Sequence, residues 1–171
     1  MSISLPVNAE ARQIISRLGM DPLPGEGGYF ARVWTSPETG PGGRALGSAI
    51  LFLITDAEFD ALHRLKTDEI WHFHAGDPAE LVRLGPGGGL ARIVVLGPDI
   101  TGGHAPQAVV PAGDWQGARI RHPGARGARG WTLFGCTLAP AWDEREFELG
   151  RREALVSEFP AHAELIRALT R

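Results

Sequence analysis

The chain has 171 residues, of which 43% are hydrophobic and 22% charged, an ordinary composition for one globular domain with its own core. Its 17 basic and 20 acidic residues give a net charge of −3, which argues against a nucleic-acid partner. No apolar run approaches the roughly 20 residues that span a bilayer, and the single cysteine excludes an internal disulfide. The first residues lack the charged and apolar segments of a signal peptide. We therefore expect one domain, residues 1–171, in the cytoplasm and without a membrane partner.

The N-terminal segment predicts a helix over residues 8–18. From Ala11 to Leu18 the apolar residues recur at the i, i+3, i+4, i+7 spacing of a helix with one buried face. Asn8 is a favoured N-cap residue, and Gly19 is a favoured residue directly after a helix. The helix should pack on the outside of the domain.

Short β-rich runs follow, separated by turns that use most of the 23 glycines and 13 prolines. Many short strands with such turns indicate an all-β sandwich or barrel rather than alternating strands and helices. The β core should cover about residues 26–148. We predict eight strands, at residues 30–35, 48–54, 69–74, 80–84, 91–96, 107–110, 118–121 and 131–138.

The last segment predicts helical structure over residues 151–169, with Pro160 at the start of a second short helix. Before it, Asp143, Glu144 and Glu146 form an acidic cluster that we interpret as a solvated surface. Both chain ends should therefore carry short helices outside the β core.

Polar and aromatic residues gather in three segments, at 26–30, 63–78 and 107–116. A carboxylate such as Glu69 on an inward strand position is costly to bury without a partner, and His63 is the obvious partner. Such a pair would raise the pKa of the histidine and suit it to acid–base catalysis near neutral pH. We expect the two side chains in contact as the catalytic pair, although a purely structural role for the histidine remains open.

Strand alternation divides the segment that begins at Glu69. Trp71 shares the parity of Glu69, so it should point inward and line a pocket, whereas His72 and His74 should face away from His63. Packing or a subunit contact therefore explains these two histidines better than a second metal site. Further candidates for substrate binding are Tyr29, Arg32 and Gln116.

The spacing of these residues resembles the cupin superfamily, whose motifs read G-x5-H-x-H-x3,4-E-x6-G and G-x5-P-x-G-x2-H-x3-N. His63, Glu69 and Gly76 match the first motif, and the run Pro111-Ala112-Gly113 matches the second. The chain is most similar to the cupin-5 branch, because the segments at 26–29, 68–78 and 135–137 agree in order and spacing. The resemblance implies an all-β jelly-roll barrel (a double-stranded β-helix) with short terminal helices, and a homodimer.

Two departures concern the metal that the resemblance implies. Leu65 stands at the second motif histidine and Gln116 at the third, so His63, Glu69 and the weak amide ligand Gln116 are the remaining set for a divalent transition metal. The sequence leaves open whether the protein uses such a metal or no cofactor.

Function has to be inferred from the site, because cupins host many reactions. The missing histidines argue against iron or manganese redox chemistry, and the resemblance to nucleotide-sugar epimerase cupins favours metal-independent proton transfer. We expect a small-molecule-binding enzyme of the isomerase or epimerase type, in which His63 moves a proton and Glu69 orients it. Two alternatives remain: a non-catalytic module that binds a metabolite, and a metal-dependent enzyme.

Overall fold

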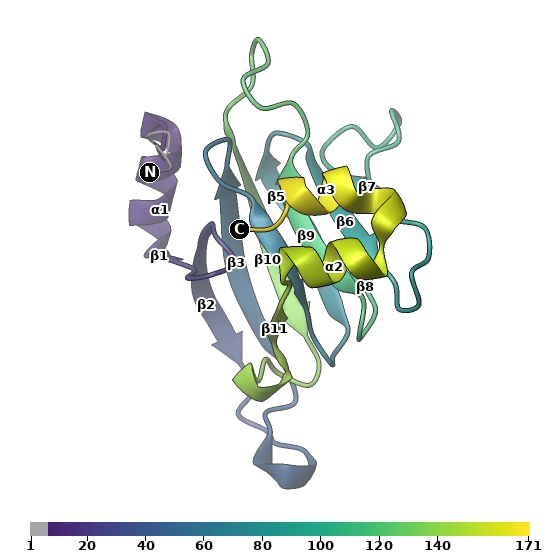
Figure 1. The fold of residues 1–171 in the computed structure, drawn as a ribbon. Helices are drawn as coiled ribbons and strands as arrows, with labels where there is room; N and C mark the ends of the chain where they lie inside the picture. The colour runs from purple at the N-terminus through teal and green to yellow at the C-terminus, as the bar shows by residue number, and fades with distance from the viewer. Residues whose placement is uncertain (1–6) are drawn as a thin grey trace.

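The computed structural model describes residues 7–171 and shows two antiparallel β-sheets with short helices near both chain ends (Figure 1). Residues 1–6, on which part of the signal-peptide expectation rests, lie outside the described residues. The larger sheet contains, in order, β1 (Asp21–Pro22), β2 (Tyr29–Thr35), β3 (Ser48–Thr55), β10 (Trp131–Leu138), β5 (Glu69–Gly76) and β8 (Gln107–Val110). The smaller sheet contains β11 (Glu148–Leu149), β4 (Asp60–Arg64), β9 (Trp115–Ile120), β6 (Ala79–Leu84) and β7 (Arg92–Leu96).

The predicted β class with helices at its ends is confirmed at this level. Among the described residues no strand pairing joins the two sheets into one closed barrel. The helices are α1 (Ala9–Leu18), α2 (Arg152–Glu158) and α3 (Ala163–Ala168), with three short 3₁₀ helices, η1 (Pro41–Gly43), η2 (Glu144–Glu146) and η3 (Pro160–His162). As predicted, the Asn8 side chain caps α1 by accepting from Ala11 N–H, and Gly19 ends it in the left-handed conformation.

All eight predicted strands are present, although β9 begins at Trp115, three residues earlier than predicted. The strand β4 was not predicted. Its sequence Asp-Ala-Leu-His-Arg lacks β-branched and aromatic residues, so local preference does not mark it as a strand. Pairing with β9 on one side and β11 on the other fixes it instead. This strand matters because it carries His63.

Three buried clusters hold these elements together. The main core lies between the sheets and combines Phe52, Trp71 and Phe134 of the larger sheet with Leu81 and Ala118 of the smaller one. A second cluster joins α2 and α3 to the outer face of the smaller sheet (Figure 1). A third joins α1 to the larger sheet. Since the helices cover outer faces, the space between the sheets stays open to side chains of β2 to β5 and β10.

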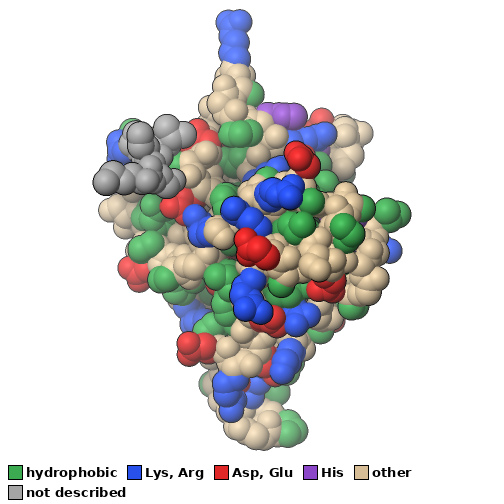
Figure 2. All heavy atoms as spheres, viewed as in Figure 1, with side chains coloured by type: hydrophobic (Ala, Val, Ile, Leu, Met, Phe, Trp, Pro, Cys, Tyr) green, Lys and Arg blue, Asp and Glu red, His purple; other side chains and the backbone are tan. Residues whose placement is uncertain are grey.

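The surface carries charges of both signs. In the view of Figure 2, the described basic and acidic side chains lie interspersed over the face that carries α2 and α3. No helix among the described residues is long and apolar enough to cross a membrane.

Candidate functional site

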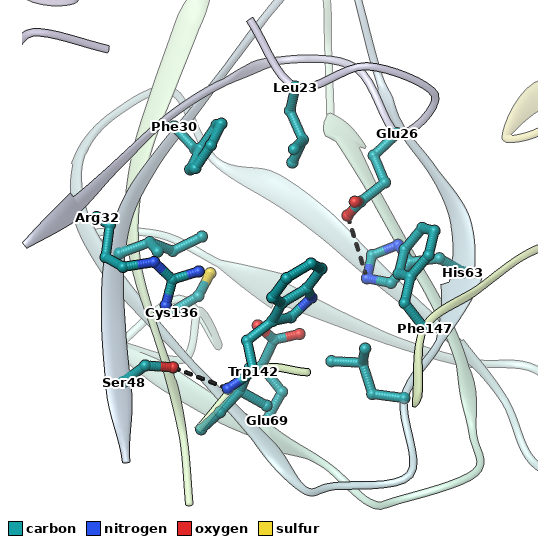
Figure 3. Close-up of a pocket in the computed structure, with 13 residues that line it drawn as sticks. Leu23, Glu26, Phe30, Arg32, Ser48, His63, Glu69, Cys136, Trp142 and Phe147 are labelled. Carbon is teal, nitrogen blue, oxygen red and sulfur yellow. Dashed lines mark hydrogen bonds and ion pairs between the residues drawn. The ribbon is translucent and has the colours of Figure 1, made fainter. Parts of the chain in front are cut away.

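A cavity of about 150 Å³ lies at the end of the main core, between the two sheets (Figure 3). Apolar and aromatic side chains form most of its wall, and a few polar groups converge on it, which is the usual composition of a small-molecule site. The polar residues that line it are Glu26, Arg32, Ser48, His63 and Glu69, and the others are Leu23, Phe30, Ile50, Leu65, Cys136, Leu138, Trp142 and Phe147.

His63 and Glu69 reach this cavity from different sheets. His63 lies on β4 of the smaller sheet, directly opposite Gln116 on β9. Glu69 begins β5 of the larger sheet, and residues 65–68 connect the two strands. The two side chains therefore face one another across the gap between the sheets, rather than lying side by side on one strand.

Gln116 fills the gap between them. The indole Nε1–H of Trp71 donates to Gln116 Oε1 at 3.0 Å. Because an indole nitrogen can only donate, this bond fixes which end of the amide is which. The Gln116 amide nitrogen then donates to Glu69 Oε2 at 2.5 Å and faces His63 Nε2 at 3.2 Å. His63 and Glu69 make no direct hydrogen bond or ion pair, so the expected direct contact is wrong.

The same contacts determine the protonation of His63. Its Nδ1 lies 2.9 Å from the carbonyl oxygen of Ala61, which can only accept, so Nδ1 carries the hydrogen. Its Nε2 faces the donor amide of Gln116 and therefore presents a lone pair. Burial lowers the pKa of His63, against the opposing effect of the Glu69 charge. The expectation of a raised histidine pKa is also wrong, because burial on the strand outweighs a carboxylate that is not in contact.

Three carboxyl groups surround this neutral imidazole. Glu26 Oε2 lies 3.6 Å from His63 Nε2, and Asp60 Oδ1 lies 3.7 Å from Nδ1. Burial raises the pKa of Glu26 to about 7 and also raises the pKa of Glu69. The pKa of Asp60 is raised well above its usual range, first by burial and then by the charges of Glu26 and Glu69. Glu26 is thus a carboxyl group that can both accept and release a proton near neutral pH.

A glycine turn places Glu26 against the sheets. The Glu26 carbonyl oxygen accepts from Ala61 N–H at 2.7 Å and from the Arg171 guanidinium at 3.3 Å. Gly27 and Gly28 follow with φ of 96° and 73°, a region that favours glycine. A Cβ on Gly28 would lie 2.7 Å from a backbone oxygen of β3. The Gly-Gly pair is therefore needed to bring the Glu26 segment this close to the larger sheet.

The described structure brings together only some of the predicted site residues. His63, Glu69 and Arg32 line the cavity. Trp71 and Gln116 lie behind the cavity, where Trp71 donates to Gln116 and Gln116 donates to Glu69. Tyr29 packs in the cluster beneath α1 instead of lining the cavity. Strand alternation explains this, because positions 29 and 32 have opposite parity.

His72 lies on the side away from the cavity, where its Nε2 is 3.2 Å from Thr137 Oγ1. A Cβ built on Gly135 would meet the ring of His74, which places this second histidine over β10 as well. Both positions agree with the parity of the strand.

Sequence reasoning missed Glu26 and Asp60 as members of the site. Glu26 stood in a segment noted for its polar residues, and the Gly-Gly pair after it was the available signal. Asp60 belongs to the strand that was not predicted, so nothing marked it as buried. Trp142 and Phe147 flank the acidic cluster interpreted as solvated, yet both reach the cavity wall.

These observations agree with the comparisons with known proteins. The chain belongs to the cupin superfamily: the family described as Cupin superfamily (DUF985), the cupin-5 branch, matches residues 12–150. The crystal structure of a protein from Shewanella oneidensis is 32% identical and has a TM-score of 0.86 over 96% of this chain and 98% of that one. A hypothetical protein from Leishmania major is 32% identical, with a TM-score of 0.84 over 94% and 98% of the chains.

A more distant similarity concerns the fold alone. A cupin 2 conserved barrel domain protein from Rhodopseudomonas palustris is 15% identical, with a TM-score of 0.57 over 87% of this chain and 83% of that one. No curated protein matches the chain.

The metal set that the motif implies does not fit a cation as these residues are arranged. A metal would need the lone pairs of His63 Nε2 and Glu69, but both atoms face the hydrogens of the Gln116 amide. An amide nitrogen of this kind donates and does not bind metal ions. Leu65, at the second histidine position, adds an apolar wall. The donor hydrogens of Gln116 thus lie where a metal ion would approach these two residues.

A second group of possible ligands lies beside it. Glu26, Asp60 and His63 each offer one ligand atom, and these atoms lie within 4.8 Å of one another. Both carboxyl oxygens of Asp60 are buried without a hydrogen-bond partner. Both ring nitrogens of His63, however, already have partners, Ala61 and Gln116. A cation held here would have to replace one of those contacts.

Proposed function

We propose that the cavity binds a small molecule and transfers a proton on it, as in an enzyme of the isomerase or epimerase type. One observation carries the proposal: the unprotonated Nε2 of His63 and the Glu26 carboxyl group, 3.6 Å apart, meet at the wall of one cavity. Glu26, whose pKa is about 7, is matched to proton transfer near neutral pH. In this proposal Glu26 takes the place first given to Glu69 as the partner of His63.

The chemistry follows from these two groups. Glu26, as a carboxylate, takes a proton from a carbon next to a carbonyl group, and the electrons of the broken C–H bond move to the carbonyl oxygen as an enolate. Where that carbon also bears a hydroxyl group, the hydroxyl proton moves to the enolate oxygen. Glu26, now a carboxylic acid, returns its proton to the former carbonyl carbon, so that the hydroxyl carbon becomes the new carbonyl group and the isomerisation is complete. The lone pair of His63 Nε2 is a second proton acceptor beside it. That lone pair accepts from the Gln116 amide, so it takes a proton when this hydrogen bond is released, and Glu69 is the remaining acid on the other side.

Hydrogen–deuterium exchange tests this proposal. Small hydroxy and keto acids and sugars are incubated with the protein in D₂O, and NMR follows deuterium entering the carbon next to the carbonyl group. The substitutions Glu26→Gln and His63→Asn should each slow exchange by ~10²–10⁴, the usual contribution of a positioned acid–base group. Melting temperatures are measured alongside. A compound that binds tightly but exchanges no faster than with the variants would instead identify a non-catalytic binding module.

One observation favours a metal-dependent enzyme as the second candidate. The buried, unpartnered oxygens of Asp60 would be satisfied by a cation shared with Glu26 and His63. Metal analysis of protein purified without a histidine tag tests this. One divalent ion per chain that is lost in Asp60→Asn would support the metal-dependent reading over metal-independent proton transfer.

The finer description of the fold is also a proposal. We infer that the two sheets correspond to the jelly-roll barrel of cupins, supported by the similarity to a conserved barrel domain protein. An experimental structure with continuous hydrogen bonds between the sheet edges would establish closure.

A further inference from the structure

Arg32 is the one arginine in the wall of the described cavity, and it is exposed to solvent there. It lies on β2 with Phe30, which shares its parity and also lines the cavity. The pairing of β2 with β3 shifts register between Arg32 and Trp34, a bulge of the kind that redirects a side chain beside a site. The Arg32 guanidinium carbon lies 5.9 Å from the ring centroid of Trp142. The bulge and the indole together direct the guanidinium at the mouth of the cavity.

The hydrogen-bond donors of Arg32 have no partner among the described residues. Of the fifteen other arginines in residues 7–171, seven are paired with an acidic side chain and eight are not. Those in ion pairs are Arg44, Arg64, Arg83, Arg119, Arg129, Arg145 and Arg171. An unpaired guanidinium has a rigid, planar set of N–H donors that matches the two oxygens of a carboxylate. The cavity wall therefore contains a guanidinium group that no acidic side chain of the described residues occupies.

A second donor lies on the same side. The buried Ser48 Oγ accepts from the backbone N–H of Trp142 at 3.0 Å, and its own hydrogen has no acceptor among the described residues. Figure 3 shows Arg32 and Ser48 on one side of the cavity, and Glu26 and His63 on the other, with the indole of Trp142 between them. The one cavity thus has a donor end and an acid–base end, with the Trp142 indole beside the space that joins them.

The size of the cavity limits the ligand. Its volume is about 150 Å³. Sites that enclose drug-sized ligands measure roughly 300–1,000 Å³. A nucleotide sugar would not be enclosed, whereas an acid of a few carbon atoms would fill the space. The epimerase resemblance therefore does not extend to the size of the substrate.

We propose that the ligand is a short carboxylic acid with a hydroxyl or keto group, whose carboxylate binds Arg32 and Ser48 while the reacting carbon lies against Glu26 and His63. The inference rests on the proposed function and names its substrate class. A phosphate ester is disfavoured, because its two negative charges would enter a cavity bordered by Glu26 and Glu69.

Binding of matched acids and amides tests the substrate class. Lactate, 2-oxobutyrate and 2-hydroxybutyrate are compared with lactamide, 2-hydroxybutyramide and glycerol phosphate by thermal shift and calorimetry. We expect at least one acid to raise the melting temperature and bind ten-fold or more tightly than its amide and than glycerol phosphate. Arg32→Gln should weaken that acid by about 10- to 100-fold. Arg32→Lys keeps the charge without the planar donors, so its affinity for that acid should lie between those of the wild type and Arg32→Gln.

The control is Arg17→Gln, which removes an exposed arginine of α1 and should leave the affinity unchanged. Amides that bind as tightly as acids, tighter binding of glycerol phosphate, or an Arg32→Gln variant with unchanged affinity would each overturn the substrate class. Acids that bind through Arg32 but show no hydrogen exchange would refute proton transfer and leave the ligand assignment intact. The two proposals therefore fail in distinguishable ways.

Discussion

The amide nitrogen of Gln116 lies 2.5 Å from Glu69 Oε2, at the position from which a metal ion would approach this carboxylate. The same nitrogen faces His63 Nε2 at 3.2 Å. An uncharged donor therefore does for these two acceptors what a cation does in a metal cupin: it satisfies both lone pairs at once. Which group stands at position 116 thus decides whether the pair is held by hydrogen bonds or by a metal.

The substitution Gln116→His should create a metal site. The new imidazole joins His63 and Glu69 in a set of nitrogen and oxygen ligands that suits Zn²⁺, Ni²⁺ or Co²⁺. We expect the variant to gain a divalent ion and to melt at a higher temperature in its presence, because a metal that binds only the folded state stabilises it. Mass spectrometry and thermal shift with added Zn²⁺ or Ni²⁺ measure both effects. Gln116→Leu, which removes the bridge without adding a ligand, should gain neither; equal metal binding in that variant would contradict the prediction.

Glu26→Gln should change how stability depends on pH. In the folded state the pKa of Glu26 is raised to about 7 from 4.5, so the unfolded chain loses this proton first as pH rises. The stability that comes from the protonated group is present below pH 4.5 and is lost between about 4.5 and 7. Its size is on the order of 3 kcal/mol. Between pH 4.5 and pH 8, the free energy of unfolding of Glu26→Gln should therefore rise by about 3 kcal/mol relative to that of the wild type.

Urea unfolding at the two pH values measures this difference. Asp60, His63 and Glu69 face Glu26 and share its titration, so the whole pH curve is fitted rather than one midpoint. Glu164→Gln, on the exposed side of α3, is the control and should show no such gain. If Glu26→Gln follows the wild type at every pH, the carboxyl group has the same pKa in the folded and unfolded states, and the pKa assignment is wrong.

Trp71→Phe should leave the side-chain amide of Gln116 free to change its orientation. Phenylalanine keeps an aromatic ring but lacks the N–H that holds Gln116 Oε1 at 3.0 Å. Leaving that buried oxygen without a donor should cost ~1–3 kcal/mol of unfolding free energy. The ring nitrogens of His63 should report the change by ¹⁵N NMR, with the Nδ1–H form dominant in the wild type and a mixture in the variant. If the variant is destabilised but the tautomer of His63 is unchanged, Trp71 contributes only through packing.

Trp34→Lys should weaken self-association, if the expected homodimer forms through β2. Among the described strands, β2 pairs with the two-residue β1 only at its first two positions, and its outer edge is open beyond them. Val33 and Trp34, exposed to 57% and 51%, lie on this stretch. Light scattering at a series of protein concentrations should show a wild-type dimer. On dilution, the variant dimer should dissociate at a higher protein concentration than the wild-type dimer. Leu90→Lys, an equally drastic change on an exposed loop, is the control. A monomeric wild type would reject the dimer.

Glycine and proline positions predicted most of the fold, because turns of this kind leave few places for the strands between them. Strand β4 was not predicted, because pairing with its neighbours rather than residue preference forms it. In the site, alternation correctly separated Trp71 from His72, which depends only on strand geometry. The proposed contact of His63 with Glu69 failed because spacing along the chain does not reveal that the two residues lie on different sheets. Asp60 became part of the site only through the strand that was missed.

The hydrogen bonds of Gln116 cross between the sheets: β9 of the smaller sheet is tied through this side chain to Trp71 and Glu69 on β5 of the larger one. A change that widens the spacing of the sheets, even at a distant core position, is expected to stretch these bonds. Interior packing and proton affinity at His63 are therefore coupled in this molecule. Core substitutions chosen only for thermal stability are therefore expected to shift the pKa of His63 as well.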